Sequence, residues 1–525
     1  MLVVLDGASR CCHKLGLFSA LDSGTVSLDV PHNAKISKST GKPSYDMGLY
    51  QFVFSDAVAV ITCKLQNEKR IKIVGWHNYF KRPSKYDGGT SERLSEMVEQ
   101  FDSLIETAST LGCLDWRTTI SGIAHSVYRA NMPDIPIYSH NSPDTKQLER
   151  QAFFGGRVSA FGTGRISEQV HYIDCVSMYP AIMGSTPLPS RILSHFRNLD
   201  CSPDRIKGNP ESMIARCLIS SNSTEYPTRE KDSLEYSIGE LETVLCGPEF
   251  KHAIDSGHVI KVMEIAEYKL DVLFADFVDK CWNARIGYRE QGNKAMEHSV
   301  KLIMNSLQGK FGQRAGELEY RPDIIPPCRW GIYRHAILDT GEIRDYRVAA
   351  GNAFQVCERS EVSGSITSIP AFIASAGRII MDKVRIAAGK NNVFYQGVDA
   401  VIVNQQGLDN LAASEIALGD DIGQFRVSKS ADSAIIYGKS HYRIGNQLIQ
   451  AGASPSVKRI SDTVFVDQRQ PSLKTSAFTG PMPHYTESSY PVFVETEHCQ
   501  VANRDFEFHP SKVSSFVEAT SLVSR

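Results

Sequence analysis

Two aspartates in this sequence stand where proteins commonly place catalytic carboxylates. Asp174 follows a run of strand-forming residues that starts at Val170, so we expect it at the C-terminal end of a strand. Asp399 is the only charged residue of segment 393–403, in which two runs of β-formers flank a short turn. This segment predicts a β-hairpin with one carboxylate at its tip. Either aspartate alone is equally compatible with a structural role.

Between the two aspartates, the sequence predicts helices at 274–290 and 294–311, which form an antiparallel helical hairpin. Residues 280–314 carry seven basic side chains and two acidic ones. On the second helix, Lys301, Asn305 and Gln308 share one face, while an apolar stripe lies on another. This pattern suits binding of an anionic ligand such as a nucleoside triphosphate. A solvated basic face would show the same pattern.

Two carboxylates on adjacent strands can hold two divalent cations about 4 Å apart, which clamps the attacking and leaving oxygens of a phosphoryl transfer. Mg²⁺ is the expected ion because it prefers carboxylate, water and phosphate oxygens, and Mn²⁺ could substitute for it. Lys301 would neutralise charge on a triphosphate. Together, Asp174, Lys301 and Asp399 therefore predict nucleotidyl transfer.

Composition fits a soluble, intracellular enzyme without a membrane partner. The chain has 525 residues, enough for two to four domains, with 42% hydrophobic and 22% charged residues. No apolar run approaches 18 residues, and the N-terminus lacks the features of a signal or transit peptide. Twelve scattered cysteines without a Cys-x-x-Cys pair indicate reduced thiols. Since the net charge is −2, a binder of polyanions must concentrate its positive charge locally.

Further elements are expected around these segments. Pro180 is placed as the first residue of a helix. We expect strands at 2–5, 52–62, 71–76 and 435–444, a hairpin around 338–342, helices at 91–108, near 247–256 and at 369–388, and a short helix at the C-terminus.

Four segments resemble, in order, the motifs of family B DNA polymerases. Asp174-Cys-Val-Ser-Met-Tyr-Pro180 is similar to motif A (Asp-x-x-Ser-Leu-Tyr-Pro), and Lys301-Leu-Ile-Met-Asn-Ser-Leu-Gln-Gly309 to motif B (Lys-x-x-x-Asn-Ser-x-Tyr-Gly). Tyr395-Gln-Gly-Val-Asp-Ala400 resembles motif C (Tyr-x-Asp-Thr-Asp-Ser), and Phe153-Phe-Gly-Gly156 resembles the Tyr-x-Gly-Gly element. The segment 313–365 resembles the insertion of the protein-primed branch, used by certain phages, adenoviruses and linear plasmids. The resemblance covers about residues 118–460.

The resemblance implies an α+β fold shaped like a right hand, with a β-sheet palm, helical-hairpin fingers and a small thumb. The implied domains are a truncated or degenerate α/β exonuclease-like domain (1–117), a connecting element with the first part of the palm (118–270), the fingers (271–312), the insertion (313–365), the palm with motif C (366–430), and the thumb with the C-terminal region (431–525). The implied partners are primer-template DNA, deoxynucleoside triphosphates and a possible terminal protein primer.

The resemblance also assigns roles to individual residues. Catalysis and binding of two Mg²⁺ ions go to Asp174 and Asp399, with the carbonyl of Cys175 as a third metal ligand. Contacts to the incoming nucleotide go to Ser177, Met178, Tyr179, Lys301 and Asn305. Tyr179 would pack under the sugar and exclude a 2′-hydroxyl. Contacts to DNA go to Gly155, Gly156, Arg157, Ser306, Tyr395, Lys439 and Tyr442.

The sequence departs from the family pattern at several positions. Gly397 stands where the first aspartate of motif C is expected, Ala400 replaces its serine, and Gln308 replaces the tyrosine of motif B. The final element, Lys439 to Tyr442, is one residue longer than Lys-x-Tyr. These changes leave open a second hypothesis, a weakened polymerase relic that binds nucleic acid or a terminal protein. A template-directed enzyme that synthesises RNA or reverse-transcribes is a third alternative, disfavoured by Tyr179.

The first 110 residues contain no Asp-x-Glu strand, which the family's proofreading domain needs. Phe52 to Asp56 and the region of Tyr86 are only faint candidates for its last motif. The sequence therefore predicts no 3′–5′ exonuclease activity.

Overall fold

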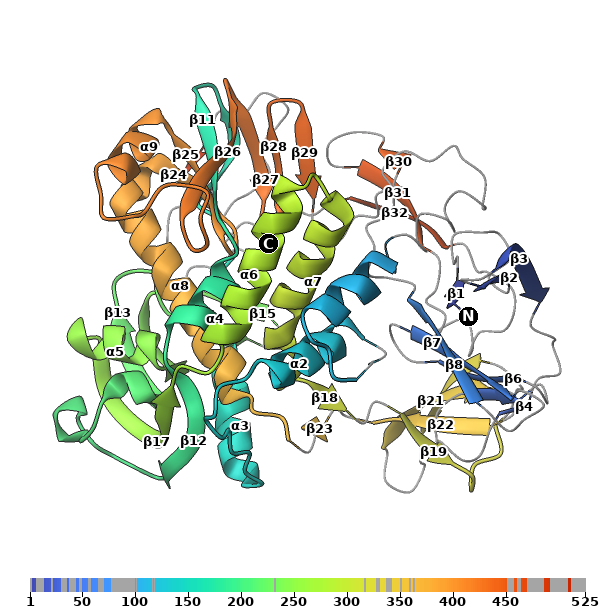
Figure 1. Cartoon of the computed structure of the whole chain (residues 1–525). Coiled ribbons are helices and arrows are strands. Elements are labelled where there is room, and N and C mark those ends of the chain that lie inside the picture. Colours follow the sequence, from blue (N-terminus) through green and yellow to red (C-terminus); the bar gives the residue numbers. More distant parts are fainter. Residues whose placement is uncertain are drawn as a thin grey trace.

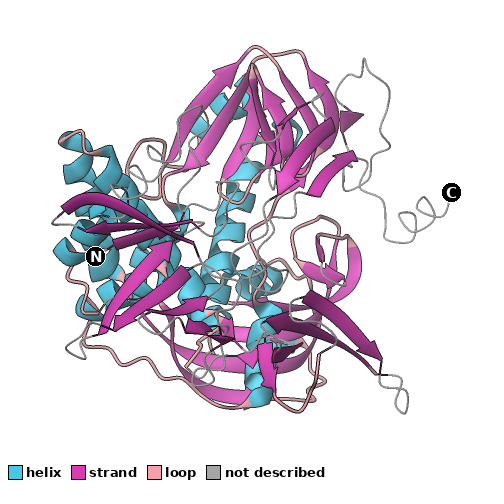
Figure 2. Cartoon of the chain, turned by 90° about the vertical axis from the view of Figure 1, so that its right-hand side faces the viewer, coloured by secondary structure: helices cyan, strands magenta, loops and turns pink. Residues whose placement is uncertain are grey.

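The computed structural model describes residue 100 and residues 102–450 apart from 116, 118, 231–232, 316–317, 327–330, 337–341, 350–351, 358–359 and 362–363, and outside this range the backbone of several strands (Figure 1). A group of helices lies between two groups of strands, one above and one below in Figure 2. None of the helices in the described part is long and apolar enough to cross a membrane.

The sheet that carries both aspartates has the strand order β26-β11-β25-β24-β9, with every neighbouring pair antiparallel. Asp174 lies on β11 opposite Ala400 of β25 and opposite Arg426 of β26. The predicted hairpin is confirmed, since β24 and β25 pair on either side of Asp399. The strands are β9 (Ser159–Ala160), β11 (Val170–Cys175), β24 (Val393–Gln396), β25 (Ala400–Asn404) and β26 (Phe425–Ala431).

The predicted helical hairpin is confirmed as α6 (Ala275–Glu290) and α7 (Lys294–Phe311). The apolar stripe of α7 is buried, while Lys301 and Asn305 are exposed. The long helix α8 (Ser368–Ala388) contributes to the same core. The remaining helices are α2 (Ile120–Ala130), α3 (Pro143–Ala152), α4 (Met178–Ser185), α5 (Pro248–Asp255) and α9 (Gln405–Ala412), with a further helical run at 102–110.

Five other sheets have strands within residues 159–450. One contains β12 (Leu188–Phe196), β13 (Met213–Ser221), β16 (Gly239–Cys246) and β17 (Val259–Asp271). Another contains β10 (Gly162–Ile166), β27 (Ala434–Gly438), β28 (His441–Ile444) and β29 (Gln447–Gln450). The predicted insertion holds β19 (Leu318–Arg321), β20 (Gly331–Ala336), β21 (Ile343–Ala349) and β22 (Asn352–Val356). The remaining two sheets are two-stranded, β14 (Thr228–Glu230) with β15 (Ser233–Glu235) and β18 (Arg314–Ala315) with β23 (Ser360–Glu361).

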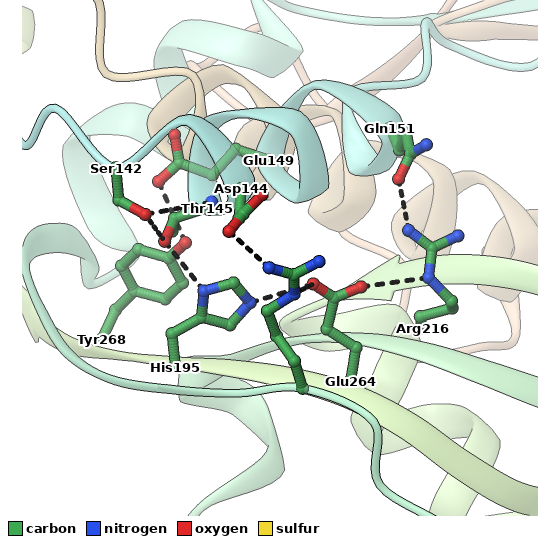
Figure 3. Close-up of polar contacts among 10 residues, drawn as sticks. Ser142, Asp144, Thr145, Glu149, Gln151, His195, Arg216, Glu264 and Tyr268 are labelled. Carbon is green, nitrogen blue, oxygen red and sulfur yellow. Dashed lines mark hydrogen bonds and ion pairs between the residues drawn. The ribbon is translucent and has the colours of Figure 1, made fainter.

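Polar side chains fasten α3 to the sheet of β12, β13 and β17 (Figure 3). Glu149 is 1% exposed and accepts hydrogen bonds from Tyr268 at 2.9 Å and from the ring of His140 at 3.1 Å. His195 lies between Thr145 and Glu264, at 2.9 and 3.0 Å. Because α3 ends directly before Phe153, these contacts fix the start of the Phe-Phe-Gly-Gly segment.

The terminal strands are described only by their backbone. They are β1 (Leu2–Leu5), β2 (Lys14–Ser19), β3 (Asp22–Asp29), β4 (Lys35–Ile36), β5 (Ser44–Asp46), β6 (Tyr50–Phe54), β7 (Val58–Lys64), β8 (Arg70–Trp76), β30 (Lys458–Arg459), β31 (Val464–Arg469), β32 (Thr486–Pro491) and β33 (His509–Pro510). The exonuclease-like domain, the other domain limits and the thumb stay predictions. The expected C-terminal helix and the first part of the expected helix at 91–108 lie outside the described residues.

Three expected elements differ from the structure. The strand at 52–62 is a hairpin of β6 and β7. The strand at 435–444 is likewise a hairpin of β27 and β28, since Ser440 has a φ of 58°, a left-handed conformation that a continuous strand excludes. The helix after Asp174 starts at Met178, two residues before Pro180.

A buried ion pair connects α5 and α8 to the Phe-Phe-Gly-Gly segment. Arg378 and Glu249 are 3% and 1% exposed and form two hydrogen bonds, at 2.7 and 2.5 Å. The third guanidinium nitrogen donates to the carbonyls of Phe154 at 3.0 Å and Gly155 at 2.8 Å. The pair therefore fixes the backbone immediately before Gly156.

We expect Glu249→Gln to lower the free energy of unfolding by about 3–5 kcal/mol, because it leaves the buried Arg378 charge without its partner. Lys251→Ala on the same helix is the control, since its pair with Asp255 is exposed. Urea unfolding measures both variants. Equal shifts in the two midpoints would contradict a special role for the buried pair.

Candidate active site

Asp174 and Asp399 lie on neighbouring strands, as the sequence predicts. The backbone N–H of Cys175 donates to the carbonyl of Asp399 at 2.8 Å, which fixes the turn against the end of β11. Burial raises the pKa of Asp399, the negative charge of Asp174 raises it further, and the ammonium of Lys301 lowers it. The charges of Asp174 and Lys301 therefore both act on the Asp399 carboxylate.

The carboxylate of Asp174 has an unsatisfied oxygen. Its Oδ1 is buried and has no hydrogen-bond partner among the described residues, and Arg426 Nε lies 3.6 Å away. A divalent cation bound here would ligate this oxygen and offset the repulsion between the two carboxylates. Asp174, Asp399 and the Cys175 carbonyl offer the oxygen ligands that Mg²⁺ prefers, so the residues fit this ion.

The turn after Asp174 contains a strained residue. Ser177 has φ 55° and ψ 51°, the left-handed conformation that residues other than glycine rarely adopt. Arg285 of α6, which is largely buried, donates to the Ser177 hydroxyl at 3.0 Å. The strained turn is thereby held by the helical hairpin, and it directs the start of α4 toward the sheet edge.

Tyr179 lies between two glycines. A Cβ on Gly156 would lie 2.9 Å from the Tyr179 hydroxyl, and one on Gly377 of α8 would lie 3.0 Å from its ring. Burial raises the pKa of Tyr179. Met178 beside it is 3% exposed, so Met178 is held in the core, whereas the ring of Tyr179 lies close to the Asp399 turn.

An aromatic group adjoins the aspartates on the sheet. The Tyr395 and Tyr442 rings are 4.7 Å apart, and Tyr172 stacks on Tyr442 at 6.3 Å. The predicted DNA contacts Tyr395 and Tyr442 are thus brought together, 4% and 6% exposed. Lys439 lies in the turn before β28, with Nζ 3.8 Å from Glu235.

Part of this chain is similar to known DNA polymerases. Residues 92–321 match the model of "DNA polymerase type B, organellar and viral". A DNA polymerase of Kluyveromyces lactis is 23% identical over 374 residues, which cover 66% of this chain and 36% of that protein. The DNA-directed DNA polymerase of Enterobacteria phage PRD1 is 24% identical over 338 residues, or 62% of this chain and 55% of that one. This chain is similar to the family B DNA polymerases.

Solved structures show the same fold. Phi29 DNA polymerase complexed with primer-template DNA and incoming nucleotides has a TM-score of 0.59 and 14% identity, with 87% of this chain and 86% of that chain covered. The resemblance to the protein-primed branch of family B is confirmed. The chain spans well under two thirds of the K. lactis and PRD1 relatives, 36% and 55% of their lengths.

In family B terms, the described residues place motif A on β11, motif B on α7 and motif C in the β24–β25 hairpin. Lys301 and Asn305 are exposed on α7, and Ser306 is half-buried one residue further along. The ammonium of Lys301 lowers the pKa of Asp399. Their individual roles stay predictions.

The Phe153–Gly156 segment, which resembles the Tyr-x-Gly-Gly element, approaches the Asp399 turn at Gly156. Gly155 has open space around its Cα, and Gly156 faces the Asp399 turn. Arg157 is 4% exposed, and its guanidinium donates to Ser159 and Thr224 and lies over the Tyr236 ring. The structure thus shows Arg157 in an intramolecular role, and its predicted contact with DNA remains untested.

Three residues near the family B motifs were not singled out by the sequence analysis. Arg426 lies opposite Asp174, Arg285 holds Ser177, and Tyr172 completes the aromatic group. Period-two alternation in β11 could have indicated that Tyr172 and Asp174 share a face. The sequence around Arg426 gives no indication that this residue belongs to the site, because only the pairing of β26 with β11 brings it there.

We expect Gly156→Ala to lower the free energy of unfolding by about 1–3 kcal/mol, because the new Cβ would overlap Val398 and crowd the Tyr179 hydroxyl. Gly155→Ala is the matched control, since a Cβ there meets nothing within 4 Å. Denaturant unfolding compares the two variants, and equal stability would show that the Val398 contact is not tight.

Proposed function

We propose that this chain is a template-directed DNA polymerase that adds deoxynucleotides to a 3′ end by two-metal phosphoryl transfer. The observation that carries the proposal is the placement of Asp174 and Asp399 on neighbouring strands, with Lys301 of α7 close enough for its charge to lower the pKa of Asp399. Primer-template DNA and nucleoside triphosphates are its proposed ligands. The phi29 structure that resembles this chain holds both.

The proposed mechanism divides the work among the residues of the site. Asp174, Asp399 and the Cys175 carbonyl would hold two Mg²⁺ ions, which supply charge neutralisation at the attacking and leaving oxygens when bound. Lys301 and Asn305 would bind the triphosphate and base from the exposed face of α7. Tyr179 would pack under the sugar, and Gly156 and Gly377 leave the space beside its ring that a Cβ at either position would fill.

The aromatic group of Tyr172, Tyr395 and Tyr442 would support the primer end beside the aspartates. Its rings are mostly buried and packed on one another, so they form a rigid surface. A rigid surface reduces the cost of aligning the 3′ hydroxyl with the phosphate. The resemblance to the protein-primed branch extends the proposal to priming by a terminal protein. It also extends it to replication of a viral or linear mobile-element genome.

A second candidate function, a weakened relic that binds nucleic acid or a terminal protein, is favoured by two observations. Gly397 leaves motif C with a single carboxylate. Arg426 also lies 3.6 Å from Asp174, where its charge competes with a cation. Both hypotheses place DNA on the same surface and differ in the extent of catalysis.

Primer extension with Mg²⁺ or Mn²⁺ separates the two functions. We expect Asp174→Asn and Asp399→Asn to reduce extension by roughly 10²–10³-fold or more, because the metal ions lose a charged ligand. Asp409→Asn, an exposed aspartate on α9, is the control with unchanged extension. Equal extension by all variants would refute the assignment, and inactive wild-type protein that still binds DNA would favour the relic.

We expect Gly397→Asp to increase extension at limiting Mg²⁺, because it adds the carboxylate that motif C lacks. A Cβ at Gly397 would make ordinary contacts, at 3.6 Å from Ala400 O and Tyr395 Cε1, so the backbone accepts a side chain. Gly397→Asn is the matched neutral control. A gain of the same size in both variants, or a loss in Gly397→Asp alone, would contradict the expected benefit of the charge.

A further inference from the structure

Side chains that commonly bind metals also gather away from the aspartate pair. Glu225 in the loop after β13, His252 on α5 and Asp382 on α8 each offer one ligand atom, and these three atoms all lie within 4.8 Å of one another. They come from elements other than β11 and the β24–β25 hairpin, so this cluster is separate from the proposed catalytic pair.

The cluster holds two carboxylates in a largely enclosed place. The side chains of Glu225 and Asp382 are 12% and 14% exposed, and His252 is 34% exposed on the open side. Nε2 of His252 lies 3.4 Å from a carboxylate oxygen of Glu225. Two carboxylates and an imidazole thus converge, and all three are side chains that ligate divalent transition metals.

Neighbouring side chains orient the three ligands. Arg385 donates to Oδ1 of Asp382, with Nε at 3.1 Å, and the second carboxylate oxygen remains for a ligand bond. His258 Nδ1 lies 3.8 Å from Glu225 and 2.8 Å from the Tyr226 hydroxyl. In metal sites, hydrogen-bonding partners of this kind orient the side chains that ligate the metal.

We infer that Glu225, His252 and Asp382 form a binding site for one divalent transition-metal ion, with Zn²⁺ as the ion that suits them best. An imidazole with two carboxylates is a donor set typical of Zn²⁺, whereas Mg²⁺ prefers oxygen ligands alone. The ion would join the 222–227 loop, α5 and α8. Because α8 leads into β24, the site would stabilise the helix that precedes the Asp399 hairpin.

The test uses the full chain carrying Asp174→Asn and Asp399→Asn, so that the proposed catalytic pair contributes no metal binding. Metal-free protein is titrated with Co²⁺, whose visible absorption reports nitrogen and oxygen ligands, and Zn²⁺ is then added to displace it. We expect the protein to bind one equivalent of Co²⁺, and we expect Zn²⁺ to displace it. We also expect Zn²⁺ to raise the Tm of the protein.

His252→Ala and Asp382→Asn in this background are expected to lose that equivalent and the Zn²⁺-dependent rise in Tm, each compared with the same variant without metal. His195→Gln is the matched control. His195 also pairs with a carboxylate, Glu264 at 3.0 Å, but belongs to no group of three ligands among the described residues. Three outcomes would each overturn the inference. The first is Co²⁺ binding that persists in His252→Ala, and the second is a thiolate-to-cobalt absorption band, which would indicate cysteine ligands. The third is the absence of any bound Co²⁺ in the chain that carries only Asp174→Asn and Asp399→Asn.

Discussion

The antiparallel pairing of β11 with β25 is the interaction on which the candidate site depends. It sets Asp174 opposite Ala400, and the hydrogen bond from Cys175 to the Asp399 carbonyl extends the pairing by one residue into the turn. A register shift by one residue would turn the side chain of Asp174 to the other face of the sheet. Backbone pairing therefore determines the positions of Asp174 and Asp399, and with them the positions of their carboxylates.

The other elements hold this sheet edge from three sides. The α6–α7 hairpin brings Lys301 and holds Ser177 through Arg285. Helix α8 lies behind Tyr179 and, through the Arg378–Glu249 pair, fixes the backbone at Gly155. Polar contacts anchor α3 before Phe153. Groups separated by long stretches of sequence are thus made rigid around one edge, which favours alignment of reacting groups.

Local patterns predicted the elements, and long-range packing decided what the sequence did not reveal. The β24–β25 hairpin, α7 and its two faces follow from alternation and helical periodicity in segments such as 393–403. The left-handed Ser440 divides a run that alternates like one strand, and its conformation depends on the neighbouring sheet. Likewise, the burial of Arg157 and the approach of Arg426 to Asp174 arise from partners far away in sequence.

The strand order also has a consequence for how the chain folds during synthesis. β11 has β25 and β26 as its neighbours, and both follow it by more than 200 residues. The backbone of β11 cannot complete its hydrogen bonds until those strands have left the ribosome, which takes on the order of ten seconds or more at about 5–20 residues per second. High contact order of this kind slows folding and leaves apolar strands exposed to aggregation meanwhile. The pairing that brings the two aspartates together thus also prolongs the time for which the nascent chain exposes unpaired strands.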